Sequence, residues 1–277
     1  MIHEASLLTL AGTFVLVLLT LSLWFAYVLA VRWQRKRRKV WHCWRLASFS
    51  LGCALLVIAF SPPMVEWGHT DLRGHMAQHL LLGMFAPIAL MLGAPGTLLL
   101  RSVPVTTARR IMTVAASMPV RCVSHPVTAL MLNVGALYLL YLTPLYKMSF
   151  HEPGIHLWLH LHFVLAGYLF CWSIAGPDPA PHRPGMRLRL VVLFFAIAAH
   201  TVLGKLMFAY GFPRGAGHDL AEIEGAAQLM FYGGDIAELL LALVFFAAWY
   251  RQRRQPAVVD DWLTADRRTL RKPDPAD

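Results

Sequence analysis

Runs of about twenty apolar residues recur along the whole chain, and no other feature constrains the fold as strongly. Such a run is long enough for a helix to cross the hydrocarbon core of a bilayer. Only 14% of the residues are charged, against about a quarter in soluble domains. The pattern therefore predicts an all-α polytopic membrane protein with seven transmembrane helices, at roughly 7–31, 46–60, 75–100, 127–146, 155–174, 188–210 and 221–249.

Basic residues gather in alternate loops, after the first, third, fifth and last apolar runs. The positive-inside rule then places the N-terminus outside and the C-terminus in the cytoplasm. An odd number of spans agrees with this orientation. The formal charge of +10 lies between the apolar runs, so it indicates topology and gives no reason to expect nucleic acid as a partner.

The chain divides into two parts by composition. Residues 1–250 hold the apolar runs and are predicted to form a seven-helix transmembrane domain in contact with the lipid bilayer. Residues 251–277 are polar and charged, with prolines near the end, and are predicted to form a disordered cytoplasmic tail.

Two histidine pairs lie at the starts of apolar runs. His75 and His79 open the third run, and His156 and His160 open the fifth. Residues four apart project from one face of a helix, and both pairs fall at the outer membrane surface. Imidazole is a good ligand for copper, zinc, iron and nickel. One such pair is explained by hydrogen-bonded helix packing, whereas two pairs at the same depth favour a metal site between the helices.

Two further residues are candidate ligands near these pairs. His69 precedes the third run and could close over the site from above. Met76 lies beside His75 and carries a thioether, a soft ligand that favours Cu(I). Methionine in a membrane helix is also an ordinary packing residue, so both interpretations of Met76 stay open.

A polar stripe runs along the seventh apolar run and must face protein or water. Gln228 and Asp235 are candidates to orient the imidazoles from a second layer, because ligating histidines usually donate their other N–H. For Glu238 we expect an internal ion pair with Lys205 of the sixth run.

Several segments, in this order, resemble the multi-spanning cytochrome c oxidase assembly family called CtaG. The resemblance covers roughly residues 60–250 and rests on HMAQHLLLGMFAPIALMLGAPG, YLTPLY, HLHFVLAGYLFCWSIAGPDPAP and QLMFYGGDIAELLLAL. It implies a non-enzymatic role in the maturation of haem–copper oxidases in the bacterial plasma (inner) membrane. Copper would then be the metal, with oxidase subunits and other copper chaperones as partners.

Three alternatives remain open on the residues alone. The segments HMAQH and HLWLHLH contain HxxxH and HxxxHxH, as in histidine-box di-iron membrane oxidases. Those enzymes also use an HxxHH box on the cytoplasmic side, and this chain has none. A haem-binding membrane cytochrome is the second alternative, although a spacing of four suits one ion better than two haems. The third is a structural partner of the oxidase whose histidines only pack.

Overall fold

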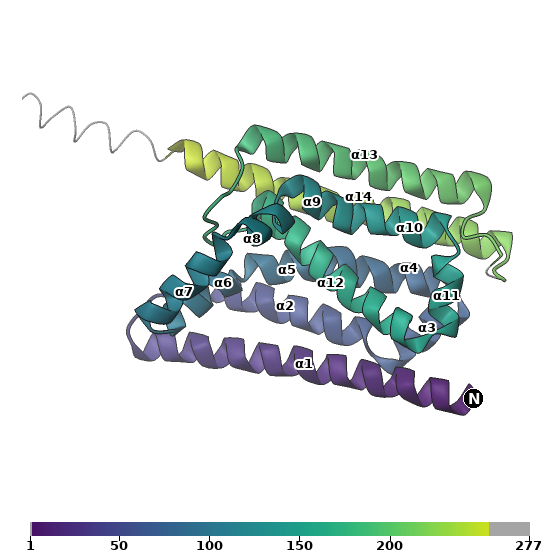
Figure 1. Ribbon diagram of the computed structural model, residues 1–277, viewed down its shortest axis with the longest axis horizontal. Coiled ribbons are helices and arrows are strands. Elements are labelled where there is room, and N and C mark those ends of the chain that lie inside the picture. The colour runs from purple at the N-terminus through teal and green to yellow at the C-terminus, as the bar shows by residue number, and fades with distance from the viewer. Residues whose placement is uncertain (1, 216, 255–277) are drawn as a thin grey trace, which may run out of the picture.

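The computed structural model describes residues 2–215 and 217–254, and within these ranges every regular element is a helix (Figure 1). The predicted all-α class is confirmed. The elements are α1 (Ile2–Lys36), α2 (Cys43–Ala59), α3 (Pro62–Thr70), α4 (Leu72–Leu80), η1 (Leu81–Phe85), α5 (Ala86–Leu92), α6 (Pro95–Ser102), α7 (Val105–Ala115), α8 (Met118–Val123), α9 (Pro126–Leu130), η2 (Met131–Gly135), α10 (Ala136–Leu142), α11 (Leu145–His151), α12 (Pro153–Ala175), α13 (Met186–Tyr210) and α14 (Leu220–Arg254).

Five helices in the described residues are long and apolar enough to cross a membrane. A sixth span results if α2 and α3, which are bent by 53° to one another, cross as one broken helix. The predicted fourth span corresponds to α9, η2 and α10, an apolar helix that is shorter than the others. The protein is therefore a membrane protein with five or six evident spans, and the count of seven stays a prediction.

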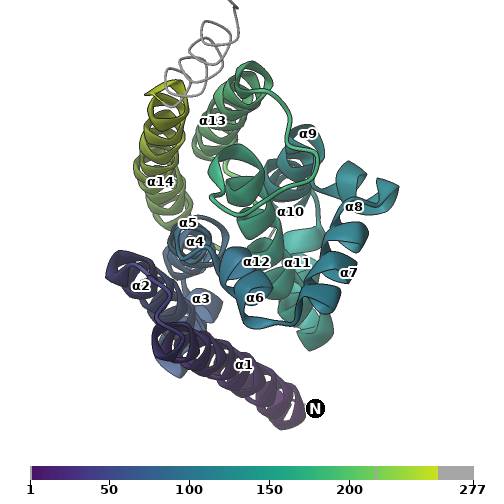
Figure 2. The same ribbon diagram turned by 90° about the vertical axis from the view of Figure 1, so that its left-hand side faces the viewer.

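The long helices run side by side and form a bundle with two distinct ends (Figures 1 and 2). Helices α1 and α2 lie on one side, α13 and α14 lie on the other, and α4, α5 and α12 lie between them. We call the end with α3, α11 and the start of α12 the histidine end. The opposite end, with α6, α7, α8 and residues 176–185, is the loop end. All the loops rich in basic residues lie at the loop end.

The third apolar run ends earlier than predicted. The transmembrane helix stops at Leu92 instead of residue 100, because Ala94 adopts a left-handed backbone (φ 52°) and Pro95 starts the separate helix α6. A proline at the first helical position is favourable, whereas inside a helix it removes a hydrogen bond. The predicted fourth span is likewise too long, because the chain leaves the helix at Thr143.

The segments η1 and η2 are π-helical turns, a rare conformation that is frequent at functional sites. Helix α12 packs directly on η1, with Gly167 against the backbone carbonyl of Gly83. A side chain on Gly167 would prevent this approach, so the glycine sets the distance between α12 and the histidine-bearing helix α4.

The predicted tail starts too early, because α14 continues in helical form through residues 251–254. The rest of that prediction, from residue 255 to 277, lies outside the described residues.

Candidate metal-binding site

The structure brings all four paired histidines to one small cavity at the histidine end. His75 and His79 reach it from α4, and His156 and His160 reach it from α12. The cavity has a volume of about 10 Å³ and is closed by apolar side chains that include Leu140 and Phe163. All four histidines are buried, so their polar rings are withdrawn from water and lipid alike. We call this space the histidine cavity.

The imidazole rings lie close to one another. The ring centroids of His156 and His160 are 4.2 Å apart, and those of His69 and His156 are 4.6 Å apart. His69 comes from α3 and lies against His156, and its predicted role of closing over the site stays a prediction. Neither ring nitrogen of His79 or of His160 has a hydrogen-bond partner within the described residues. Buried polar atoms normally have one, so these nitrogens are available to a ligand.

A polar network that the sequence analysis missed surrounds His75. The rings of Tyr146 and Tyr141 lie edge-on to it, at 5.1 and 6.1 Å between centroids. The Tyr146 hydroxyl is 3.0 Å from Nε2 of His218, and Nδ1 of His218 is 2.8 Å from the carboxylate of Glu222. Burial raises the pKa of Tyr146. The YLTPLY segment, already notable in the sequence, is the signal that contains both tyrosines.

Hydrogen bonds at the bend between α2 and α3 and at the start of α4 position the histidine pair. Pro63 has no N–H to donate to the Ala59 carbonyl, and Nε2 of Gln78 donates to that carbonyl instead at 2.8 Å. Asp71 then starts α4, with its carboxylate accepting from the Arg73 N–H at 2.8 Å. The Arg73 side chain also binds this carboxylate and lowers the pKa of Asp71.

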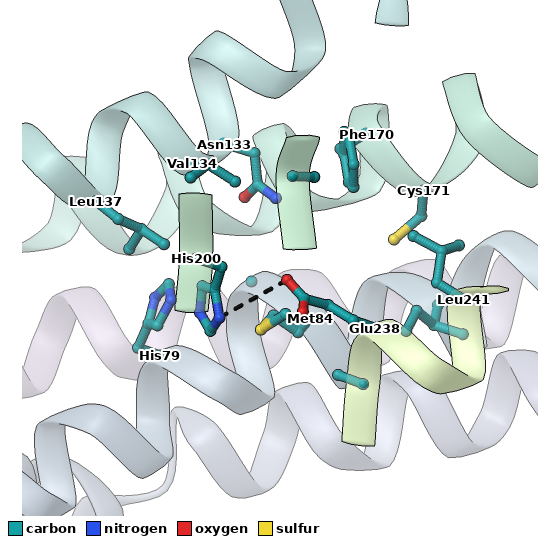
Figure 3. Close-up of a pocket in the computed structure, with 14 residues that line it drawn as sticks. His79, Met84, Asn133, Val134, Leu137, Phe170, Cys171, His200, Glu238 and Leu241 are labelled. Carbon is teal, nitrogen blue, oxygen red and sulfur yellow. Dashed lines mark ion pairs between the residues drawn. The ribbon is translucent and has the colours of Figure 1, made fainter. Parts of the chain in front are cut away.

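A second cavity lies near the middle of the bundle and shares His79 with the first (Figure 3). Its volume is about 20 Å³, and its chemically notable lining residues are His79, Met84, Asn133, Cys171, His200 and Glu238. Nδ1 of His200 is 3.7 Å from Oε1 of Glu238. We call this space the mid-bundle cavity.

Helical periodicity hides the relation between His79 and Met84. Five residues along a regular α-helix are about 140° apart around its axis, so Met84 is expected on another face. The π-helical turn η1 has hydrogen bonds between residues five apart, and here both side chains line the mid-bundle cavity. No pattern in the sequence predicted the π-helical turn. The depth of His200 and Glu238 within their apolar runs was the available signal.

The remaining predicted residues do not line either cavity. Met76 is buried against Tyr141, whose hydroxyl is 3.9 Å from the Met76 sulfur. Gln228 is exposed and lines a surface groove with Lys205, and Asp235 is half-buried on α14. The structure does not bring these side chains to the histidines.

The prediction of an ion pair between Glu238 and Lys205 is wrong. Glu238 lies beside His200, and the ammonium of Lys205 is 5.8 Å from the centroid of the Phe231 ring. The Lys205 ammonium therefore contacts the face of an aromatic ring and borders a surface groove, whereas the Glu238 side chain points into the bundle.

In residues 2–215 and 217–254, no group of three or more His, Cys, Asp or Glu side chains is placed so that it could hold a metal ion. The histidines that line the histidine cavity and the mid-bundle cavity are instead arranged as closely spaced pairs. Such pairs can offer an ion about two imidazole donors at a time, which suits exchange of ligands better than permanent retention. The four cysteines are free thiols.

Comparison with known proteins gives the class to which this arrangement belongs. The model of the family described as cytochrome c oxidase caa3 assembly factor (Caa3_CtaG) matches residues 25–252. The chain belongs to this family, as its motifs indicated, and the family's role is assembly of cytochrome c oxidase.

Relatives at the sequence level are uncharacterised proteins of mycobacteria. The chain is 34% identical over 245 residues to one from Mycobacterium bovis and 30% identical over 246 residues to one from Mycobacterium leprae. Each alignment covers 82% of this chain and 37% of the relative, so the chain spans little more than a third of their length. No solved structure matches it.

Proposed function

We propose that the chain carries copper for the assembly of a haem–copper oxidase in the bacterial plasma membrane, and that the histidine cavity holds the ion. The observation that supports this most strongly is the meeting of two histidine pairs, from α4 and α12, in one cavity. The unpartnered ring nitrogens of His79 and His160 are the natural donors. Oxidase subunits and other copper chaperones are the partners in this proposal, and the role is not enzymatic.

The geometry fits a carrier better than a storage site. A carrier must release its ion, and two imidazoles at a time bind copper less firmly than a complete set of ligands. The His69 ring lies tilted against the His156 ring, and His69 is the proposed entry position above the cavity. Met76, Gln228 and Asp235 would have to move to take part, and their contribution stays a prediction.

The size of the histidine cavity argues against haem. A volume of about 10 Å³ is near the minimum for one water molecule, so it suits a single ion far better than a porphyrin. A di-iron enzyme would need a larger set of ligands than these pairs provide.

The proposal includes an orientation, with the histidine end facing outside. It is supported by the gathering of the basic loops at the loop end, which the positive-inside rule assigns to the cytoplasm. A C-terminal tag should therefore be protected from protease in intact spheroplasts and digested in inverted vesicles; the reverse result would contradict the orientation.

The function is tested by gene deletion and complementation in a strain without a second gene of this family. Deletion should leave the oxidase polypeptides present and the oxidase activity low, and the unaltered gene should restore activity. The double variant His156→Asn/His160→Asn should fail to restore it. The matched control is His162→Asn on the same helix, because His162 binds the Leu132 carbonyl outside the cavity.

Added copper separates delivery from other roles. If the histidine cavity delivers copper, excess copper in the medium should partly restore oxidase activity to the strain carrying the double variant. Full activity of the double variant without added copper would contradict the proposed site.

A further inference from the structure

We infer that the mid-bundle cavity is a second Cu(I) site, with His79, His200 and Met84 as donors and Glu238 positioning His200. This rests on the proposed function, because copper must first enter through the histidine cavity. The mid-bundle cavity would then be a second binding site deeper in the bundle, and an ion would pass inward between two cavities that share one ligand.

The placement of His200 carries the argument. Its side chain is only 2% exposed, and neither of its ring nitrogens has a hydrogen-bond partner among the described residues. Its ring packs against Gly234 of α14, where even a methyl group would collide with it. A buried imidazole without a hydrogen bond is costly in an apolar interior, and the fold makes room for this one specifically.

The other donors face the same space (Figure 3). The His79 and His200 rings lie next to each other, and the Met84 side chain extends toward His200 on the side of Glu238. His79 and Met84 lie on one continuous helical run. Both side chains reach the cavity because the π-helical turn η1 lies between His79 and the end of that run. The second π-helical turn, η2, contributes Asn133 and Val134 to the same lining. Two rare turns at one cavity point to a functional site.

The cavity and its donors select the ligand. About 20 Å³ holds one water-sized species, so an organic ligand does not fit. Two imidazoles suit several transition metals, but a thioether donor favours Cu(I) over zinc or Cu(II). Glu238 lines the same cavity, and a bound monovalent cation would favour the charged form of its carboxyl, which then compensates the charge of the ion.

Glu238 acts through His200. The separation of 3.7 Å between its Oε1 and Nδ1 of His200 is just beyond a hydrogen bond and closes with a small side-chain movement. Once formed, this hydrogen bond holds the proton on Nδ1 and leaves Nε2 to bind the metal, as carboxylates do for metal-ligating histidines. Glu238 is therefore a positioning residue.

His79 connects the two sites because it lines both cavities. An ion held by His79 and the α12 histidines can be taken over by His200 and Met84 while it stays bound to His79. The transfer changes ligands and needs no change in the oxidation state of copper.

The test uses the full-length protein in detergent, titrated anaerobically with Cu(I) against a coloured Cu(I) chelator. X-ray absorption at the copper edge reports the ligand types. The unaltered protein should bind two equivalents of Cu(I), with His79 on the deeper ion and the α12 histidines holding the first, and should show sulfur scattering. Met84→Leu should abolish the sulfur scattering and weaken the second equivalent about tenfold or more. The matched control is Met91→Leu, because Met91 is a buried methionine on the same helical run outside the cavity. It should change neither result.

Further variants distinguish failure of this inference from failure of the proposed function. His156→Asn/His160→Asn should remove the first equivalent and keep the sulfur-bound one. Glu238→Gln should weaken the second equivalent and leave the first unchanged. One equivalent of Cu(I) without sulfur, or sulfur scattering that survives Met84→Leu, would overturn the second site and leave the proposed function standing. Absence of Cu(I) binding by the unaltered protein would overturn both.

Discussion

Buried polar side chains at the two ends of the bundle differ in whether they have hydrogen-bond partners. At the loop end they are tied to backbone groups. The Asp178 carboxylate accepts from the N–H groups of Gly96 and Thr97 at 3.1 and 2.6 Å. The Tyr27 hydroxyl donates to the Gly93 carbonyl at 2.7 Å, and the Arg189 guanidinium donates to the Ile174 carbonyl at 2.8 Å.

At the histidine end and in the mid-bundle cavity, three buried histidines line the cavities instead. His79, His160 and His200 have no hydrogen-bond partner on either ring nitrogen within the described residues. The difference teaches that burial of a polar residue does not by itself indicate a site. A polar group bonded to backbone stabilises the fold, whereas an unpartnered one costs stability and is a candidate for binding.

The largest expected effect comes from Gly167→Ala, which should damage both cavities together. The added Cβ would lie 2.8 Å from the Gly83 carbonyl carbon and 3.1 Å from Pro87, so α12 must move away from η1. We expect a loss of about 3 kcal/mol in unfolding free energy and weaker Cu(I) binding. Thermal unfolding in detergent and the Cu(I) titration measure the two effects.

The control for Gly167→Ala is Gly154→Ala, in the first turn of the same helix. An added Cβ there meets no atom within 4 Å among the described residues, so stability and copper binding should not change. If Gly167→Ala lowered stability yet left copper binding intact, the position of α12 would not matter to the sites.

The next effect in size is that of Asp178→Ala, at the loop end. Asp178 caps the N-terminus of α6 from a distant loop and also accepts from the Thr97 hydroxyl at 2.6 Å. Loss of a helix cap typically costs about 0.5–2 kcal/mol, and the burial of this one favours the upper part of that range. Copper binding should stay unchanged, because the residue serves the fold alone.

Asp178→Asn is the graded control, since its side-chain oxygen can still accept one of these hydrogen bonds. Its unfolding temperature should lie between those of the unaltered protein and Asp178→Ala. A loss of copper binding in either variant would contradict the division between the two ends.

The sequence was sufficient for the helical class, the family and the meeting of the histidine pairs. A spacing of four fixes a common face on a helix, and the starts of the third and fifth apolar runs fall at the same depth. The His75, His79, His156 and His160 side chains accordingly line one cavity. Their role as copper ligands stays a prediction.

The rest could not be predicted because it depends on departures from regular helices. The π-helical turn η1 turns Met84 toward the face of His79, and the left-handed Ala94 ends the third span early. The pairing of Glu238 with His200 instead of Lys205 depends on how α13 and α14 are rotated against each other. Apolar runs of similar composition do not specify that rotation.

The smallest expected changes in stability test the difference between binding and structural histidines most directly. They come from two single variants on the same helix, one at His160 and one at His162. His160 is buried without a partner on either ring nitrogen, whereas Nε2 of His162, two residues later, donates to the Leu132 carbonyl at 2.9 Å. Replacing an unpartnered polar ring by an apolar side chain of similar size should be neutral or slightly stabilising, so His160→Leu should leave the unfolding free energy unchanged or raise it by up to about 1 kcal/mol. His162→Leu removes a hydrogen bond to the π-helical turn η2 and should lower it by about 1 kcal/mol. Copper titration should give the reverse order, with His160→Leu impaired and His162→Leu normal. If His160→Leu were the less stable variant of the two, His160 would be a packing residue, and the proposed distinction between structural and binding histidines would fail on this helix.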